Sequence, residues 1–291
     1  MRIVSLLPSA TEIAYAIGAG PDVVGVTFEC DYPAEARAAR VVSTSALPQG
    51  LDPKEIDAAV SAALARGEDL YHLDAGALAD LDADLILTQD LCAVCAVDVS
   101  VVDDALAHLG CHADVLTIDP HTLTEVLESI RTIGDRTGHA ARADELVAGL
   151  HDRLAAIGAA VSGRPRPRTI VLEWTDPPFA PGHWLPEMVT AAGGDCILGT
   201  AGEKSQRITW SDVRRSRPDV IVSAPCGYDL DGSARLTHQI LEDLPPAPVW
   251  AVDANASYAR PGPRLVDGVE ALAAILHPDA VPPSALARRI R

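Results

Sequence analysis

Short runs of β-branched residues alternate with longer amphipathic stretches rich in Ala and Leu along the first half of the chain. This alternation is typical of strand–helix–strand units, which build parallel sheets. The expected strands are 3–7, 23–27, 85–88 and 115–118, and the expected helices lie near 9–18, 52–66, 74–81 and 100–109. Asp52 and Pro53 support the second helix, because Asp caps a helix N-terminus and Pro fits the first helical position.

A different pattern occupies the middle of the chain. Thr122 and Glu125 have the spacing of a capping box, which opens a stripe of apolar residues at helical intervals. Gly134 and Gly138 interrupt the stripe, and a second helical stripe then continues for about 23 residues, roughly 35 Å. We therefore expect 122–161 to form a helical spine between two lobes.

The second half repeats the alternation of the first half, without a close sequence repeat. The expected strands are 169–174, 196–198, 220–224 and 249–253, and the expected helices lie near 185–192, 210–216, 234–243 and 262–276. A chain of 291 residues is longer than one hydrophobic core usually organises. The predicted fold class is α/β: two lobes with mostly parallel sheets, joined by the spine. The predicted domains are an N-terminal lobe at 1–121, the spine at 122–161 and a C-terminal lobe at 162–291.

Composition and charge narrow the class of protein. Hydrophobic residues make up 48% of the chain, which excludes a disordered polypeptide. The formal net charge is −18, and nucleic-acid-binding proteins normally present a basic face, so we expect no nucleic-acid partner. Residues 1–121 hold 5 basic and 20 acidic side chains, whereas 122–291 hold 18 and 21. The first half therefore disfavours an anionic ligand, unless helix N-termini receive it.

No targeting segment or membrane span is visible in the sequence. Glu12 interrupts the first apolar stretch, and no apolar run reaches the roughly 18 residues of a transmembrane helix. These absences predict a cytoplasmic location and no membrane insertion. In that compartment the six cysteines are expected to be reduced thiols or metal ligands and not disulfides.

Aromatic residues gather where the predicted strands end. Ligands of open parallel sheets bind beyond the carboxyl ends of the strands. The strand-end aromatic residues are Phe28, Tyr32, Trp174, Phe179, Trp184, Tyr228 and Tyr258. Aromatic walls predict a large, flat, partly apolar ligand. The alternative interpretation is that some of these rings cap the cores of the lobes.

Several cysteines share the same strand-end loops. They are Cys30, Cys92, Cys95 and Cys226. Cys92 and Cys95 form one Cys-x-x-Cys pair, a spacing found in metal sites and redox sites. If the loops meet, the four thiolates could hold zinc or an iron–sulfur cluster. The competing interpretation is that cysteines pack as small neutral side chains, which we favour for Cys111 and Cys196.

Catalytic signatures are absent from the sequence. It contains no G-x-S-x-G, P-loop, G-x-G-x-x-G or H-E-x-x-H sequence. This favours a binding protein over an enzyme, although Glu29 and Glu173 leave an acid–base pair conceivable. His183 lies in another strand-end loop, where a neutral imidazole could ligate a metal or the metal of a chelate ligand. The alternative for His183 is a structural hydrogen bond.

The opening of the chain resembles a known family. The segment RIVSLLPSATE at 2–12, followed by IGAG at 17–20 and VVGVT at 23–27, is highly similar to the start of cobalamin-binding members of the class III periplasmic-binding-protein superfamily. That superfamily comprises the vitamin B12- and iron-siderophore-binding proteins of ABC importers. The resemblance covers essentially the whole chain, and it implies two Rossmann-like lobes, a rigid helical spine and a ligand held between the lobes.

Further segments resemble a subgroup without a signal peptide, often described as cobalamin-binding-like. They are ECDYP at 29–33, DLCAVC at 90–95, GHWLPEM at 182–188 and SYARPGP at 257–263. The strand-end loops and these segments together supply the candidate ligand-binding residues. These candidates are Glu29, Cys30, Tyr32, Asp90, Cys92, Cys95, Trp174, Phe179, His183, Trp184, Cys226, Tyr228, Tyr258 and Arg260.

Two departures from the superfamily argue against delivery to an ABC permease. Exported members carry a signal peptide or lipid anchor, and each of their lobes presents a docking glutamate. Near the matching helix start of the second lobe, this chain has Ser211 and Asp212 instead. We therefore expect a soluble protein that binds a corrinoid or another metal chelate, as a carrier, a scavenger or an ABC-transporter-related binding component. The alternative is a metal protein or enzyme that reuses the cleft and holds zinc or an iron–sulfur cluster at the cysteines.

Overall fold

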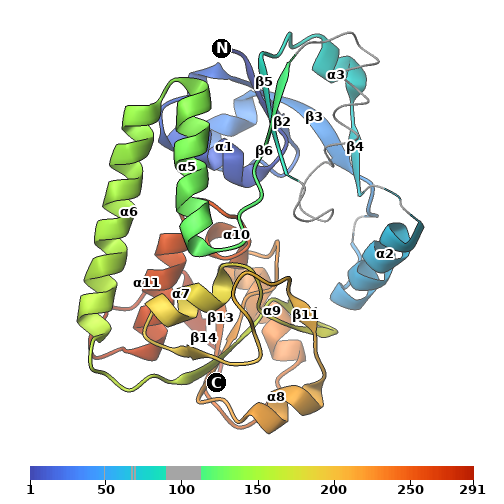
Figure 1. The fold of residues 1–291 in the computed structure, drawn as a ribbon. Helices are drawn as coiled ribbons and strands as arrows, with labels where there is room; N and C mark the ends of the chain where they lie inside the picture. Colours follow the sequence, from blue (N-terminus) through green and yellow to red (C-terminus); the bar gives the residue numbers. More distant parts are fainter. Residues whose placement is uncertain (49, 67, 69, 90–112) are drawn as a thin grey trace. The chain divides into compact units, whose positions relative to one another are not determined.

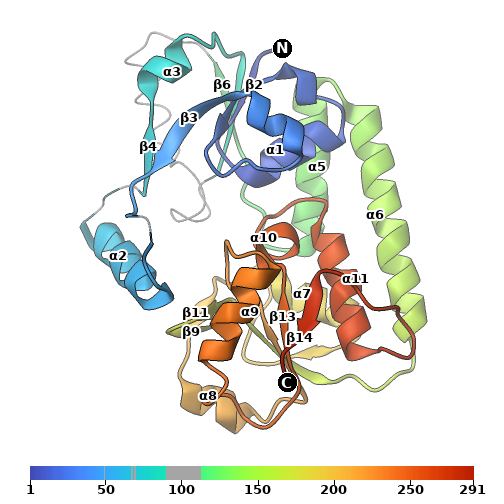
Figure 2. The same ribbon diagram turned by 180° about the vertical axis from the view of Figure 1, so that it is seen from behind.

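The computed structural model describes the chain in two compact units. It covers residues 1–291 except 49, 67, 69 and 90–112. The first unit comprises Met1–Pro120 and Leu127–Val147, and the second comprises His121–Val126 and Ala148–Arg291. Figure 1 and Figure 2 show the elements of both units from opposite sides, and each unit is described by itself.

The first unit is built on one sheet with the strand order β4-β3-β2-β1-β5-β6. Its strands are β1 (Ile3–Ser5), β2 (Val23–Thr27), β3 (Arg40–Ser45), β4 (Tyr71–Leu73), β5 (Leu85–Thr88) and β6 (Asp114–Thr117). All pairs are parallel except β3 with β4, which run antiparallel. Every residue of β1 and β5 is buried, as expected for the central strands of a parallel sheet covered on both faces.

Helices flank this sheet. They are α1 (Pro8–Ala16), η1 (Gly20–Asp22), η2 (Ala34–Ala38), α2 (Pro53–Arg66) and α3 (Ala75–Ala79). The N-terminus of α2 is capped reciprocally, since Asp52 accepts a hydrogen bond from the Glu55 N–H at 2.8 Å and Glu55 accepts one from the Asp52 N–H at 2.9 Å. Val4, Val42 and Ile86 lie in one apolar cluster, so neighbouring strands share a core.

Two long helices follow, α5 (Leu123–Thr137) and α6 (Ala140–Val161). The predicted interruption falls at Gly138, whose φ of +75° ends α5 in a conformation that glycine adopts without strain. Gly134 lies inside α5 instead, and a Cβ there would come within 2.4 Å of the Ala143 Cβ. Gly134 therefore permits the close approach of the two helices. The predicted spine as a domain of its own stays a prediction, because both helices contribute residues to both units.

The second unit contains a sheet with the strand order β10-β7-β12-β13-β14 and a smaller sheet with the order β11-β9-β8. The larger sheet comprises β7 (Arg168–Leu172), β10 (Asp195–Cys196), β12 (Val220–Ser223), β13 (Val249–Val252) and β14 (Ala287–Arg289). The smaller one comprises β8 (Trp174–Thr175), β9 (Pro178–Ala180) and β11 (Gln206–Arg207). The helices are α7 (Leu185–Ala191), α8 (Trp210–Ser216), α9 (Leu230–Gln239), α10 (Ala254–Ser257) and α11 (Leu265–Leu276). In the larger sheet β14 pairs antiparallel with β13, and the other pairs are parallel.

The predicted α/β class with two units and parallel-rich sheets is confirmed. The buried, apolar strands lie where their sequence pattern placed them, whereas β3, β4, β14 and the smaller sheet were not predicted. β3 and β14 carry several exposed polar residues, and the strands of the smaller sheet are too short to show a period. The predicted helix near 100–109 lies outside the described residues, and the predicted ligand cleft between the lobes stays a prediction.

Candidate functional site

Strand order locates the ligand-binding edge of each sheet. In open α/β sheets, ligands bind at the carboxyl ends of the two adjacent strands where the chain reverses its direction across the sheet. In the first unit this switch point lies between β1 and β5, because β2 and β3 extend to one side and β6 to the other. In the second unit it lies between β7 and β12, with β10 on one side and β13 on the other.

The switch point of the second unit carries an aromatic pair. Trp174 follows β7 and Tyr228 follows β12, and their ring centroids lie 5.9 Å apart at an interplanar angle of 51°. Both side chains are half-buried, so each keeps a surface that a ligand can contact. Tilted aromatic pairs at this separation are favourable. The structure therefore brings together two of the residues that the sequence predicted for the site.

Phe179 extends this pair into a row. In the β8–β9 ladder Trp174 lies directly opposite Phe179, and in the β9–β11 ladder Phe179 lies directly opposite Arg207. Directly opposite residues of an antiparallel pair point to the same face of the sheet. Thr175, which follows Trp174, and Ala180, which follows Phe179, are buried on the opposite face of the smaller sheet. We refer to Tyr228, Trp174 and Phe179 as the aromatic strip.

Arg207 ends the aromatic strip with a positive charge. Its guanidinium carbon lies 5.7 Å from the centroid of the Phe179 ring, within the range of a cation–π contact. Arg207 is exposed and Phe179 is half-buried. Sequence reasoning missed Arg207, because its strand is two residues long and its position opposite Phe179 depends on pairing between segments far apart in the chain.

Backbone hydrogen bonds hold the loops around the strip. The N–H of Cys226 donates to the carbonyl oxygen of Glu173 at 3.1 Å, which connects the loop after β12 to the end of β7. The carboxylate of Glu173 accepts a hydrogen bond from the Gly182 N–H at 3.2 Å. A Cβ on Gly182 would come within 2.3 Å of the Ser205 backbone nitrogen, so this close crossing requires glycine. Cys226 itself is exposed next to the strip.

Trp184 and Tyr258 have packing roles in the same unit. Trp184 is 6% exposed, and its indole Nε1–H donates to the Tyr258 carbonyl oxygen at 2.8 Å. The Tyr258 hydroxyl, which is buried, donates to the Gly268 carbonyl oxygen at 3.0 Å, and burial raises the pKa of Tyr258. These bonds favour the alternative that some strand-end aromatic residues cap the core. Arg260, also predicted for the site, is buried. Contact of these three residues with ligand stays a prediction.

His183 is half-buried beside Trp184, with ring centroids 5.5 Å apart. Burial lowers the pKa of His183, and the nearby charges of His121 and Lys204 lower it further. Its φ of +48° is unusual for a residue with a side chain, and its N–H donates to the Glu203 carbonyl oxygen at 2.6 Å. The buried Nε2 atom has no hydrogen-bond partner. A neutral imidazole therefore fits this position.

The first unit places other predicted residues after β2. The Tyr71 hydroxyl donates to a Glu29 carboxylate oxygen at 2.9 Å, and the Tyr71 and Phe28 rings lie 5.9 Å apart. Tyr71 begins β4 and pairs with Ser45 at the carboxyl end of β3. Sequence reasoning missed Tyr71, because β4 was not predicted. Tyr32 is exposed at this edge and joins Pro33 through a cis peptide bond.

The predicted metal site gains no support among the described residues. Cys30 is buried, and its Sγ lies 3.0 Å from the Thr11 hydroxyl, a contact that fits a small packed side chain. Asp90, Cys92 and Cys95 lie outside the described residues. Across the rest of the chain, no group of three or more His, Cys, Asp or Glu side chains is arranged to hold a metal ion.

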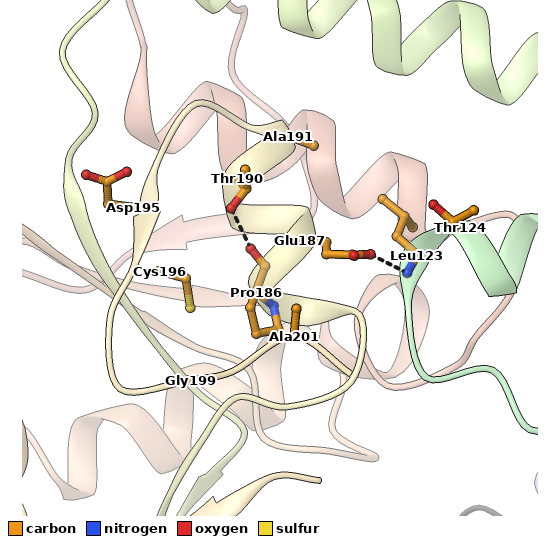
Figure 3. A pocket seen from close by; sticks show the side chains of 10 residues that line it. All are labelled: Leu123, Thr124, Pro186, Glu187, Thr190, Ala191, Asp195, Cys196, Gly199 and Ala201. Atoms are coloured by element: carbon orange, nitrogen blue, oxygen red, sulfur yellow. Dashed lines mark hydrogen bonds between the residues drawn. The ribbon is translucent and has the colours of Figure 1, made fainter. Parts of the chain in front are cut away.

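A shallow cavity of about 590 Å³ lies elsewhere in the second unit, beside α7 and the N-terminus of α5. Figure 3 shows Glu187 pointing toward Leu123 at its edge. Its polar groups bond to one another: Glu187 accepts from the Leu123 N–H at 2.7 Å, and the Thr190 hydroxyl donates to the Pro186 carbonyl oxygen at 3.0 Å. None of the predicted ligand-binding residues lines this cavity. The candidate site therefore stays at the switch point of the second unit.

Each of the two α/β units has a parallel-rich sheet, and aromatic residues lie at the switch point of the second. The family model of periplasmic binding proteins matches residues 3–252, so the chain belongs to the periplasmic binding protein family. The predicted resemblance is thereby confirmed.

Individual relatives are distant. The chain is 26% identical to the uncharacterized ABC transporter substrate-binding lipoprotein YvrC of Bacillus subtilis, over 96% of this chain and 80% of the relative. It is 24% identical to the vitamin B12-binding protein of Salmonella typhimurium, over 80% of this chain and 73% of the relative.

Solved structures share the fold. A periplasmic heme-binding protein from Pseudomonas aeruginosa superposes with a TM-score of 0.73 at 19% identity, covering 99% of this chain and 97% of that one. The periplasmic vitamin B12-binding protein BtuF of Vibrio cholerae superposes with a TM-score of 0.67 at 22% identity, covering 94% and 96%.

These relationships correct the predicted cytoplasmic location, which is wrong. The relatives are lipoproteins or periplasmic proteins, which points to a location outside the cytoplasm. The prediction relied on the absence of a leader segment, a weaker observation than similarity across nearly the whole chain. The sequence argument against delivery to a permease also runs against the family. The alternative of a zinc or iron–sulfur protein is not supported by any of these relatives. In the described part of the chain, no helix combines the length and apolarity needed to cross a membrane.

Proposed function

We propose that this protein is the substrate-binding component of an ABC importer and that its ligand is a corrinoid. The observation that carries the proposal is the Trp174–Tyr228 pair at the switch point of the second unit, with centroids 5.9 Å apart. Together with Phe179, it presents conjugated rings on one edge of a rigid sheet. Such a surface favours a large, flat ligand.

Charge favours a corrinoid over a haem as that flat ligand. The formal net charge of the chain is −18. A haem brings two carboxylates, which so acidic a protein repels. A corrin ring carries uncharged amides at its edge, and these can donate hydrogen bonds to protein carboxylates. Relatives with either ligand are known, since one is a vitamin B12-binding protein and another binds heme.

Delivery to a permease follows from the same assignment. One relative is a substrate-binding lipoprotein of an ABC transporter, and binding proteins of this family hand small ligands to membrane permeases. A test is coelution of the ligand-loaded protein with its permease in detergent, compared with the ligand-free protein. A second binding protein of the same family, added as a competitor for the permease, should abolish this coelution if the two proteins dock at the same site.

A titration tests the ligand. Calorimetry with cyanocobalamin, dicyanocobinamide and haemin should give saturable one-to-one binding of at least one corrinoid, and weaker binding of haemin. Trp174→Ala should weaken corrinoid binding. Ser211→Ala, at an exposed position on α8, serves as a control outside the site. Tighter binding of haemin than of both corrinoids would assign the site to haem. Binding of none of the three would refute the proposal.

A further inference from the structure

The positive charge at the end of the aromatic strip points to a feature of the ligand. Arg207 and Phe179 lie directly opposite each other, with the guanidinium carbon 5.7 Å from the ring centroid. Trp174 lies opposite Phe179 on the neighbouring strand. The three side chains share one face of the smaller sheet. A flat molecule on the strip therefore has a cation beside one of its ends.

The chemistry of a guanidinium group suits one kind of anion. It stays charged throughout the physiological pH range and holds five N–H donors in a planar fork, which matches the geometry of phosphate oxygens. A cation–π contact with Phe179 is compatible with hydrogen bonds from this fork to an anion. The second unit, residues 121–126 and 148–291, is also nearly balanced in charge, with 15 basic and 17 acidic side chains. The second unit thus tolerates one anionic group beside Arg207.

We propose that Arg207 is a specificity-determining residue that selects corrinoids carrying a phosphodiester-linked nucleotide over corrinoids that lack it. This inference rests on the proposed function and deepens it. The corrin ring lies against the aromatic strip, and the single phosphodiester of the nucleotide tail pairs with the guanidinium of Arg207.

We expect Arg207 variants to fold, because the side chain is exposed. It lies on a two-residue strand, and cation–π contacts at exposed positions contribute little to stability. Arg207→Gln keeps a hydrogen-bonding amide but removes the charge and shortens the side chain, and Arg207→Lys keeps the charge without the planar fork. Arg164→Gln is the matched control, because Arg164 is an exposed arginine of the same unit whose Nε–H donates to the Ala160 carbonyl oxygen.

Calorimetric titration with cyanocobalamin and dicyanocobinamide tests the inference. Both probes are formally uncharged overall, so a difference in affinity does not report net charge. The wild type should bind cyanocobalamin at least about tenfold more tightly, the scale of one charge-assisted hydrogen bond. In Arg207→Gln that preference should fall toward one through weaker cyanocobalamin binding, and Arg207→Lys should restore part of it. The salt dependence of cyanocobalamin binding should fall in parallel.

The outcomes separate the inference from the proposed function. A wild type that binds both corrinoids equally, or an Arg207→Gln variant that keeps the full preference, overturns the role of Arg207 and leaves corrinoid binding intact. An equal loss of preference in Arg164→Gln also overturns it, because the effect would then come from the general charge of the unit. A wild type that binds neither probe refutes the proposed function, and this inference with it.

Discussion

The carboxylate of Glu187 on α7 accepts a hydrogen bond from the backbone N–H of Leu123, the first residue of α5, at 2.7 Å. The two residues lie 64 positions apart in the chain and belong to the same unit. The first N–H groups of a helix have no partner inside the helix, and negative charge near that end is favourable. Glu187 therefore caps α5 from another element, beside the local Thr122–Glu125 pair.

Glu187→Ala should destabilise the second unit. The substitution leaves the Leu123 N–H without its charged acceptor, and loss of a charge-assisted hydrogen bond costs about 1.5–3 kcal/mol. Urea unfolding monitored by circular dichroism measures the change in the free energy of unfolding. Glu242→Ala, an exposed glutamate of the same unit, should change it by less than about 0.5 kcal/mol. Equal effects of both substitutions would show that the Glu187–Leu123 bond contributes nothing.

Trp174 and Trp184 should respond in opposite ways to truncation. Trp174→Ala removes a half-buried ring from the aromatic strip, so we expect weaker corrinoid binding by ~1–3 kcal/mol and little change in stability. Trp184→Ala removes a ring that is 6% exposed and hydrogen-bonded to Tyr258, so we expect a loss of ~3–5 kcal/mol in unfolding free energy. Urea unfolding and calorimetric titration of both variants measure these effects. A folded Trp184→Ala variant with wild-type stability would contradict the packing role.

Stability should fall in mild acid because of His183. Burial, and then the charges of His121 and Lys204, lower the pKa of His183 from its ordinary value of 6.5. The unfolded chain therefore binds a proton at a higher pH than the folded chain. The resulting stabilisation is complete above pH 6.5 and disappears as the pH falls through the folded-state pKa.

His183→Asn should reduce this acid sensitivity, and asparagine tolerates the positive φ at that position. Unfolding free energies measured between about pH 7.5 and pH 5 should decrease less steeply for this variant than for the wild type. His238→Asn, at an exposed position on α9, should follow the wild-type profile. If the unfolding free energies of the wild type and of His183→Asn decreased equally with falling pH, His183 would not be the source of the acid sensitivity.

The described thiols should differ in reactivity. Cys226 is exposed, whereas Cys30 is buried. Burial, and then the charge of Glu173, raise the pKa of the Cys196 thiol to about 12, although a hydrogen bond from the Gly199 N–H lowers it. Because the thiolate is the nucleophile, alkylation by iodoacetamide at neutral pH should label Cys226 first, as followed by peptide mass spectrometry. Labelling in urea should make the three rates similar, and fast labelling of Cys196 in the folded protein would contradict its burial.

Local sequence pattern was sufficient to predict the framework. Leu85–Thr88 and Val220–Ser223 are short apolar runs between helical stretches, and both are fully buried central strands. The helix starting after Asp52 was also predictable, because its capping residues lie within one turn. Apolar runs and capping residues are formed by neighbours in the chain, so these strands and this helix can be predicted without knowledge of tertiary contacts.

The sequence by itself therefore determined the α/β class, the buried strands, and the strand-end loops in which the candidate site lies. Only the tertiary structure decided which aromatic residues of those loops can meet a ligand. Trp174 and Trp184 both lie in predicted strand-end loops. Trp184 is nevertheless buried, and it is hydrogen-bonded to Tyr258, 74 residues away. Arg207 enters the site only through its register with Phe179. Burial and antiparallel register depend on contacts between distant segments of the chain. A strand of two residues is too short to show an alternation of polar and apolar residues, so neither property could be predicted from its sequence.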